Sequence, residues 1–430
     1  MKSKALILLS GFMFVMFVML AGWTSNLFSA DIKLVFRFND PEAKEMREAL
    51  DVFEKNNPGI KVELQTIAWG NSRDQFLREI AVGEGPDVVH IAFVWPKDMG
   101  NAGGLRPLND YIKNENIHGG FDTFVATELT TNEKGDIYGI PWTTDTWALV
   151  YNKDLMAQAG ISKYPTSWPE LKNASKMIHE KTGKTGFGFP MGSAKGNTIW
   201  FLANYYWWSN GKALVKYDSN GGYKVGITEN DIAESIEYFH SYVKDGHSPE
   251  LMLSISTASD PAIIEALLSG EQGIAMMPPN MLRQLVEDFE TRNPGKALPF
   301  VTKIFPGGSA GSKTHLGGRT LGINSHSKNP EASWKLVKFL TSEIIFEKFY
   351  TKQFPAQKVL LKNITFGPSL KGYAEQLALA RSWGAYADSP AQIGSMWNKV
   401  GRIFGDAFIG TISSNEAGMD VIKMVEKELK

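Results

Sequence analysis

The chain of 430 residues contains no cysteine. This absence excludes disulfide bonds, thiolate metal sites, cysteine nucleophiles and a lipid-modified cysteine near the N-terminus. Histidine is also scarce: there are seven, and none forms an H-x-x-x-H pair that would suggest a zinc site. We therefore expect neither a metal nor a cofactor.

An excess of charge of one sign is missing as well. The formal net charge is -1, and the lysines and arginines are scattered along the chain. Such a sequence lacks the basic patch that binding to nucleic acid requires. The hydrophobic content of 43% and the charged content of 21% are ordinary for a globular protein. The chain has more residues than one hydrophobic core usually contains, and its length suits two lobes.

The N-terminus has the pattern of an export signal. Two lysines precede an apolar run over residues 5–23. Ala30 offers a cleavage point, but Phe28 is bulky where a small residue is preferred, and the run is nearly long enough to span a bilayer. We expect residues 1–30 to be a signal peptide or an uncleaved N-terminal anchor. In either case the rest of the chain lies outside the cytoplasm.

The first hundred residues after this segment alternate between strand and helix patterns. Strands are expected at 32–38, 61–69 and 88–95, and helices at 41–60 and 73–87. A β-α-β-α-β order predicts a mostly parallel, doubly wound sheet. Because ligands of such sheets bind beyond the carboxyl ends of the strands, four residues become candidates: Asn39, Asp40, Trp69 and Trp95.

A second α/β lobe is expected to begin near Tyr138. Its helices are predicted at 167–183, 231–246 and 260–273, followed by a buried strand at 273–278. The Gly-rich stretch "FPGGSAGSKTHLGGR" then breaks all periodicity, and one more strand and a mostly helical tail follow.

One motif suggests a hydrolase but lacks its context. "GGSAG" matches the G-x-S-x-G of a nucleophile elbow, which needs a strand before Ser309 and a helix after it. Pro306 precedes the motif and "SKTHLGG" follows it, so we interpret it as a flexible connection.

Six segments in order resemble a known family. "GEGPDVVHI", "GGLRPLNDYI" and "IYGIPW" precede the hallmark-like "ALVYNKDLMAQAGISKYPTSWPEL", and "ALLSGEQGIAMMPPN" and "LGGRTLGINSHSKNPEASWKLVKFLTSE" follow it. From about Ile32 to the C-terminus, the chain resembles the extracellular solute-binding proteins of ABC transporters, in the sugar-binding group that includes maltose-binding protein. Two features depart from that pattern. The lipoprotein cysteine is missing, and "PPNM" replaces a Gly-Pro-Trp-like turn, which puts a ligand contact near Asn280 in doubt.

The resemblance implies a periplasmic-binding-protein-like fold of two α/β lobes joined by a hinge of several crossing segments. The ligand would lie between the lobes, which close over it by a hinge motion. The crossings are expected near Thr143–Trp147, within 306–318 and near Thr341–Ile345. The implied first lobe is 31–144 plus 316–342, and the second is 146–312 plus 346–430.

The resemblance also implies a function without catalysis. The protein would be the monomeric substrate-binding component of an ABC importer, periplasmic or extracellular and associated with the cell surface. It would capture a carbohydrate, an oligosaccharide in particular, and deliver it to the transmembrane permease subunits. Two alternatives stay open. An exported glycosidase would need two carboxylates at catalytic separation, and the solute could be other than a sugar.

A carbohydrate offers flat C–H faces and many hydroxyls. Aromatic rings bury the first, and carboxylates, amides and arginine bind the second. The candidate ligand-binding residues, from strand ends and from the resemblance, are Asn39, Trp69, Trp95, Thr144, Asp145, Asn197, Trp200, Asn280, Gly318, Arg319, Trp383 and Tyr386. Each has an alternative role: the tryptophans could pack, Asp145 could bond to hinge backbone, and Arg319 could join the lobes.

The aromatic run "NYYWWSNG" is expected to be mainly core. Successive helical residues point about 100° apart, so four consecutive rings cannot share one face. Trp207 and Trp208 also lie about 10 to 12 Å along the axis from Trp200. We therefore predict packing for Tyr205, Tyr206, Trp207 and Trp208, and likewise for Trp397 in a later helix.

Overall fold

The computed structural model describes residues 32–38, 43–194, 196–351, 353–363, 367, 369–390 and 393–430, with only the backbone at positions 69, 70 and 363. The predicted signal or anchor segment, Asn39 and Asp40 lie outside these residues. Within the described part of the chain, no helix has the length and apolar character needed to cross a membrane.

The first lobe is built on a six-stranded sheet in the order β12-β4-β11-β3-β1-β2. Its strands are β1 (Ile32–Phe38), β2 (Ile60–Thr66), β3 (Val88–Ala92), β4 (Ile140–Asp145), β11 (Gly317–Ile323) and β12 (Phe354–Pro355). β1 pairs in parallel with β2 and β3, whereas β11 runs antiparallel to β3 and β4. β3 is buried at every position, as its apolar sequence requires.

Helices cover this sheet and close its core. They are α2 (Ala43–Asn56), α3 (Trp69–Ile80), α4 (Pro96–Asn101), α5 (Asn109–Glu115), α6 (Thr127–Thr130), α13 (Pro330–Leu340), α14 (Glu343–Lys348) and α15 (Lys358–Asn363), with 3-10 turns η1 (Ile117–Gly119) and η2 (Phe121–Thr123). α2 buries Met46, Leu50 and Phe53, which lie three to four residues apart on one face. Trp69 was expected to end a strand but begins α3, because β2 stops at Thr66.

The second lobe contains a four-stranded sheet in the order β10-β5-β9-β6. Its strands are β5 (Ala148–Asn152), β6 (Thr185–Phe187), β9 (Gln272–Met277) and β10 (Phe300–Lys303), and a separate hairpin joins β7 (Val215–Asp218) to β8 (Gly222–Val225). β6 and β9 are parallel, and β5 is antiparallel to both β9 and β10.

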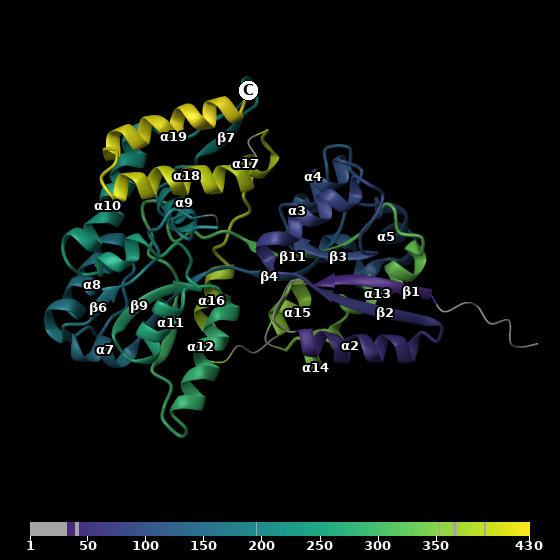
Figure 1. The fold of residues 1–430 in the computed structure, drawn as a ribbon, viewed down its shortest axis with the longest axis horizontal. Coiled ribbons are helices and arrows are strands. Elements are labelled where there is room, and N and C mark those ends of the chain that lie inside the picture. Colours follow the sequence, from purple (N-terminus) through teal and green to yellow (C-terminus); the bar gives the residue numbers. More distant parts are fainter. Residues whose placement is uncertain are drawn as a thin grey trace, which may run out of the picture.

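The second lobe is rich in helices. They are α7 (Lys153–Gln158), α8 (Trp168–Thr182), α9 (Ile199–Ser209), α10 (Glu229–Lys244), η3 (Glu250–Leu253), α11 (Pro261–Leu268), α12 (Pro279–Arg292), α16 (Lys371–Leu377), α17 (Ala385–Asp388), α18 (Ile393–Phe408) and α19 (Ser414–Glu428). Ser167, Thr228 and Ser413 open α8, α10 and α19 with capping boxes, which fixes where these helices start. Figure 1 shows α18 and α19, in yellow, stacked at one end of this lobe.

Along the described elements, the chain passes from one lobe to the other three times, and the first two passages join the two sheets (Figure 1). The first passage lies between Asp145 and Ala148, and the second between Lys303 and Gly317; the expected crossings were near Thr143–Trp147 and within 306–318. The third was expected at 341–345, and this was wrong. It lies between α15 and α16, after Asn363.

The reason is that the segment 343–363 packs in the first lobe. Ile345, Phe346 and Tyr350 are buried in the core of that lobe, and β12 pairs with β4. Residues from 346 onward had been expected in the second lobe, but Phe346, Tyr350 and β12 belong to the first lobe. A strand of only two residues, Phe354–Pro355, makes the pairing, so the sequence carries no periodic signal for it.

Candidate functional site

Two of the crossing segments meet side by side. Asp145 and Thr144, at the end of β4, pair with Gly317 and Gly318, at the start of β11. Gly318 has φ 147°, and a Cβ there would lie 2.2 Å from the Thr143 carbonyl oxygen. Only glycine permits this close approach. The pairing places side chains from both strands at the boundary between the lobes.

Opposite charges from the two strands face each other at this point. The Arg319 Nη1 atom lies 3.6 Å from Asp145 Oδ2. The Arg319 and Asp145 side chains are 22% and 28% exposed, so solvent reaches part of each charged side chain. A carboxylate held near a guanidinium can accept hydrogen bonds from hydroxyl groups, and such charge-assisted bonds are strong.

His315 adds a buried polar group beneath this pair. Its Nδ1 atom shares a 2.6 Å hydrogen bond with the Tyr205 hydroxyl, and its Nε2 atom lies 3.9 Å from Asp145 Oδ1. Burial, together with the positive charge of Arg319, lowers the pKa of His315 to about 3. The imidazole is therefore neutral at neutral pH, and its approach to Asp145 is not an ion pair.

Hydroxyl groups fix the backbone around His315. The Thr146 hydroxyl donates to the His315 carbonyl (2.8 Å) and shares a 2.7 Å hydrogen bond with the Thr314 hydroxyl. The Thr144 hydroxyl donates to the Gly317 carbonyl at 3.1 Å. Thr144 is buried and bonded within the hinge, in agreement with the structural alternative for this residue.

A group of half-buried rings lies next to the polar residues. We call Trp147, Phe201 and Trp397 the aromatic platform. Phe201 stacks on Trp147 with ring centroids 4.9 Å apart and meets the edge of Trp397, also at 4.9 Å. The ring of His315 lies 4.9 Å from Phe201 on the same group. The second lobe thus presents partly exposed aromatic surface beside Asp145 and Arg319.

The predicted site residues Trp200, Trp383 and Tyr386 come together, but in the core. Trp200 is fully buried and stacks on Trp383 at 5.6 Å, with Tyr386 5.5 Å away. Trp383 and Tyr386 are 6% and 4% exposed. These rings cover one another, which agrees with packing, the alternative weighed for Trp200. Tyr205, Trp207 and Trp208 of the aromatic run are buried too.

The remaining candidates are spread out. Asn197 is buried; its Oδ1 accepts from the Trp200 backbone N–H at 3.2 Å, and its Nδ2 donates to the Trp397 carbonyl at 3.4 Å. Asn280 is exposed in the first turn of α12. Trp95 is half-buried at the start of α4. Asn39 is outside the described residues.

His315, Trp147 and Phe201 were not among the site residues predicted from the sequence, and Trp397 was expected only to pack. Trp147 could have been found, since it follows Asp145 within the predicted first crossing. Phe201 adjoins Trp200 but points about 100° away from it around α9, to the half-buried side. No local signal marks His315, because its place depends on the pairing of β11 with β4.

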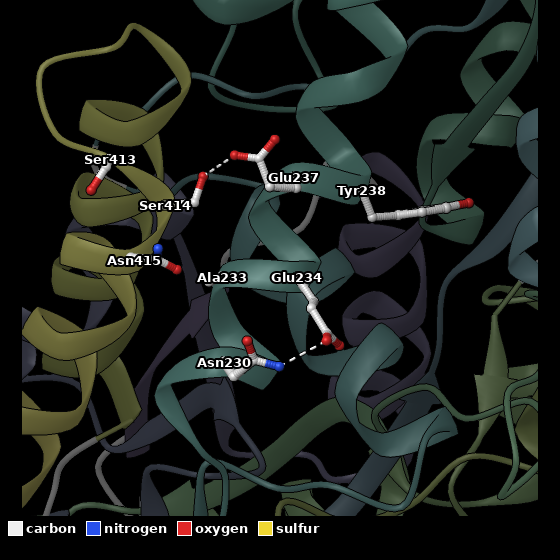
Figure 2. A pocket seen from close by; sticks show the side chains of 8 residues that line it. All are labelled: Asn230, Ala233, Glu234, Glu237, Tyr238, Ser413, Ser414 and Asn415. Atoms are coloured by element: carbon white, nitrogen blue, oxygen red, sulfur yellow. Dashed lines mark hydrogen bonds between the residues drawn. The ribbon is translucent and has the colours of Figure 1, made fainter.

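A separate pocket lies between α10 and α19 (Figure 2). Its lining contains none of the candidate residues: it is formed by Asn230, Ala233, Glu234, Glu237, Tyr238, Ser413, Ser414 and Asn415. Asn230 donates to Glu234 at 2.7 Å, and the Ser414 hydroxyl donates to Glu237. The first bond runs along α10, and the second joins α19 to α10, as Figure 2 shows.

Known proteins share the fold and the sequence pattern of this chain. A protein of Brucella abortus, provisionally named a binding protein, is 26% identical over 70% of this chain and 68% of its own length. The maltooligosaccharide ABC transporter solute-binding lipoprotein of Streptococcus pneumoniae is 22% identical over 94% of this chain and 90% of its own.

The fold is shared with a solved receptor. The GacH receptor of Streptomyces glaucescens superposes with a TM-score of 0.77 at 23% identity, covering 92% of this chain and 98% of the receptor. Such receptors are two-lobed, like the present structure. The sequence model of one family matches residues 39–344. The chain belongs to the bacterial extracellular solute-binding proteins.

Proposed function

We propose that this protein is the substrate-binding component of an ABC importer and captures a carbohydrate, an oligosaccharide in particular. The carbohydrate binds between the lobes against the aromatic platform, and the lobes close over it. The observation that carries the proposal is the meeting of partly exposed rings with the Asp145–Arg319 pair at the crossing strands.

The chemistry of this surface suits a sugar. The rings of Trp147 and Phe201 offer flat apolar area for the C–H faces of a pyranose. Asp145 accepts hydrogen bonds from hydroxyls, and Arg319 donates to ring or hydroxyl oxygens. An anion would instead need several convergent cations, and here the cation of Arg319 already faces a carboxylate.

The relatives support the same class of solute. The Streptococcus pneumoniae relative is named for maltooligosaccharide, and the GacH receptor was solved with acarbose. By analogy, the protein acts outside the cytoplasm, and its loaded form docks on the permease subunits of a transporter. It performs no reaction on the solute and works as a monomer.

The proposal is tested by a thermal-shift screen against a panel of carbohydrates, with product analysis of the same samples. A ligand at 100 times its Kd stabilises the native state by about 2.7 kcal/mol, which raises the melting temperature. We expect a shift with at least one oligosaccharide, which is recovered intact. A shift that fades while smaller sugars accumulate would instead identify a glycosidase, and a shift only with peptides, polyols or anions would replace the carbohydrate.

The matched variant is Asp145→Asn, which keeps the shape of the side chain. We expect it to weaken binding about tenfold or more, because hydrogen bonds to a charged group contribute about 1.5 to 3 kcal/mol. A variant that binds the same sugar unchanged would remove Asp145 from the site.

A further inference from the structure

The two lobes also touch at a place far from the crossing strands in sequence. Lys97, in α4 of the first lobe, donates a hydrogen bond from Nζ to Asp388 Oδ1 at 2.6 Å. Asp388 is the last residue of α17 in the second lobe. The partners are 291 residues apart, so their contact reports how the lobes are placed relative to one another.

The surroundings strengthen this ion pair. The Lys97 side chain is 19% exposed and the Asp388 side chain 38%. Val94, just before α4, and Ala387, in α17, each pack against the hydrophobic cores of both lobes. Partial removal from water makes the attraction between the charges stronger than that of a fully exposed pair.

Among the described ion pairs, Lys97 takes part only in the one with Asp388, although its charge also opposes the rise in the pKa of the adjacent Asp98. The neighbouring Asp98 lies 3.7 Å from Arg73, and burial raises the pKa of Asp98. The described ion pair of Lys97 therefore joins the two lobes, and no described ion pair joins Lys97 to its own lobe.

The pair is mechanically connected to the candidate site. Tyr386, two residues before Asp388, packs on Trp200 and lies 6.2 Å from Trp383. The Trp383 ring in turn lies 5.7 Å from His315 and 6.4 Å from Phe201. On the first lobe, Lys97 follows the candidate Trp95 by two residues. The ion pair is therefore linked to residues at the edge of the candidate site through these ring contacts.

We propose that Lys97 and Asp388 form an interlobe latch that holds the lobes together at the contact between α4 and α17. The latch sets the ratio of closed to open conformations. It goes beyond the proposed function, because it acts on the lobes whichever solute binds. Two conformations that differ by a few kcal/mol are biased by one such contact.

The test measures the distance between the lobes in the full chain without any solute. Because the chain has no cysteine, the changes Asn114→Cys and Lys181→Cys introduce two spin labels without background, one in α5 and one in α8. Pulsed electron spin resonance then gives the distribution of distances. We compare Lys97→Met, Asp388→Asn and the exchange Lys97→Asp with Asp388→Lys.

We expect each single change to increase the ratio of long to short distances about twofold to fivefold. The exchange should restore the original distribution. The control is Lys33→Met, which removes the 2.7 Å ion pair with Glu63 inside the first lobe and should leave the distances unchanged. In 1 M salt, where the Debye length is about 3 Å, the unmodified pair should behave like the single variants.

Superimposable distributions for Lys97→Met, Asp388→Asn and the unmodified pair would overturn the latch. So would an equal change in the Lys33→Met control. Neither result would contradict the proposed function, because the carbohydrate screen tests that function separately. Conversely, a screen in which no carbohydrate binds would not change the distances measured without solute.

Discussion

His315 shows how a single residue depends on its surroundings. Its ring is buried beside Tyr205 and near the guanidinium of Arg319, which keeps it neutral. A neutral histidine beside Asp145 adds no positive charge there, and among the described ion pairs the guanidinium of Arg319 lies 3.6 Å from the carboxylate. The described polar part of the site thus includes one cation and one anion, and both side chains are partly exposed.

This burial predicts a pH dependence of stability. The pKa of His315 is about 3 in the folded protein and about 6.5 when unfolded, so the unfolded state binds more protons between these values. Stability is therefore lost as the pH falls below 6.5. The contribution of His315 amounts to about 2 kcal/mol between pH 7 and pH 5.

The parent protein should lose free energy of unfolding between pH 7 and pH 5, and His315→Gln should lose about 2 kcal/mol less. Urea unfolding at the two pH values measures both losses. The exposed His326→Gln serves as the control and should keep the slope of the parent. Parallel slopes for the parent and His315→Gln would contradict a buried neutral imidazole.

At the scale of elements, α9 separates packing from binding. Its Trp200 faces the core under Trp383, whereas the adjacent Phe201 faces the aromatic platform with Trp147. One turn of helix thus serves both purposes, because successive side chains point about 100° apart.

This separation predicts that one variant mainly affects stability and another mainly affects binding. Trp200→Ala should lower the free energy of unfolding by about 3 to 5 kcal/mol, since it empties a buried site. Trp147→Ala should leave most of the stability but weaken carbohydrate binding about tenfold or more, since it removes the ring face. Denaturant unfolding and calorimetric titration measure the two quantities. Trp147→Phe, which keeps an aromatic ring, is the control. It separates weaker binding caused by the lost ring from weaker binding caused by unfolding of Trp147→Ala.

Elements with strong local patterns were predictable from the sequence. β1 and β3 are mostly apolar, the first half of β2 alternates apolar and polar residues, and α2 has a clear buried stripe, so the β-α-β-α-β start was confirmed. The crossings near Thr143–Trp147 and within 306–318 were expected from the resemblance alone, and the structure has passages between Asp145 and Ala148 and between Lys303 and Gly317. Long-range pairing could not be predicted: β12 has two residues, and only its partner β4 makes it a strand.

The site was less predictable than the fold for a related reason. Asp145 and Arg319 were proposed separately and do meet at the paired ends of β4 and β11. The exposure of each ring depends on how α9, α17 and α18 pack, which no local pattern encodes. Trp200, Trp383 and Tyr386 look like ligand rings in the sequence, yet each is covered by the others.

At the scale of the whole molecule, two sheets are joined by three chain passages and a second contact at Lys97 and Asp388 (Figure 1). Crossing strands allow rotation of the lobes, and a contact at another place limits it. We therefore expect a bound carbohydrate and the interlobe contact to favour the same closed arrangement.

The most direct test of the central claim measures the distance between labels at 114 and 181 while the carbohydrate found in the screen is titrated in. We predict that the short-distance population grows in proportion to bound sugar and that the sugar is recovered chemically unchanged. Binding that leaves the distances unchanged, or sugar that is cleaved during the titration, would contradict capture by lobe closure.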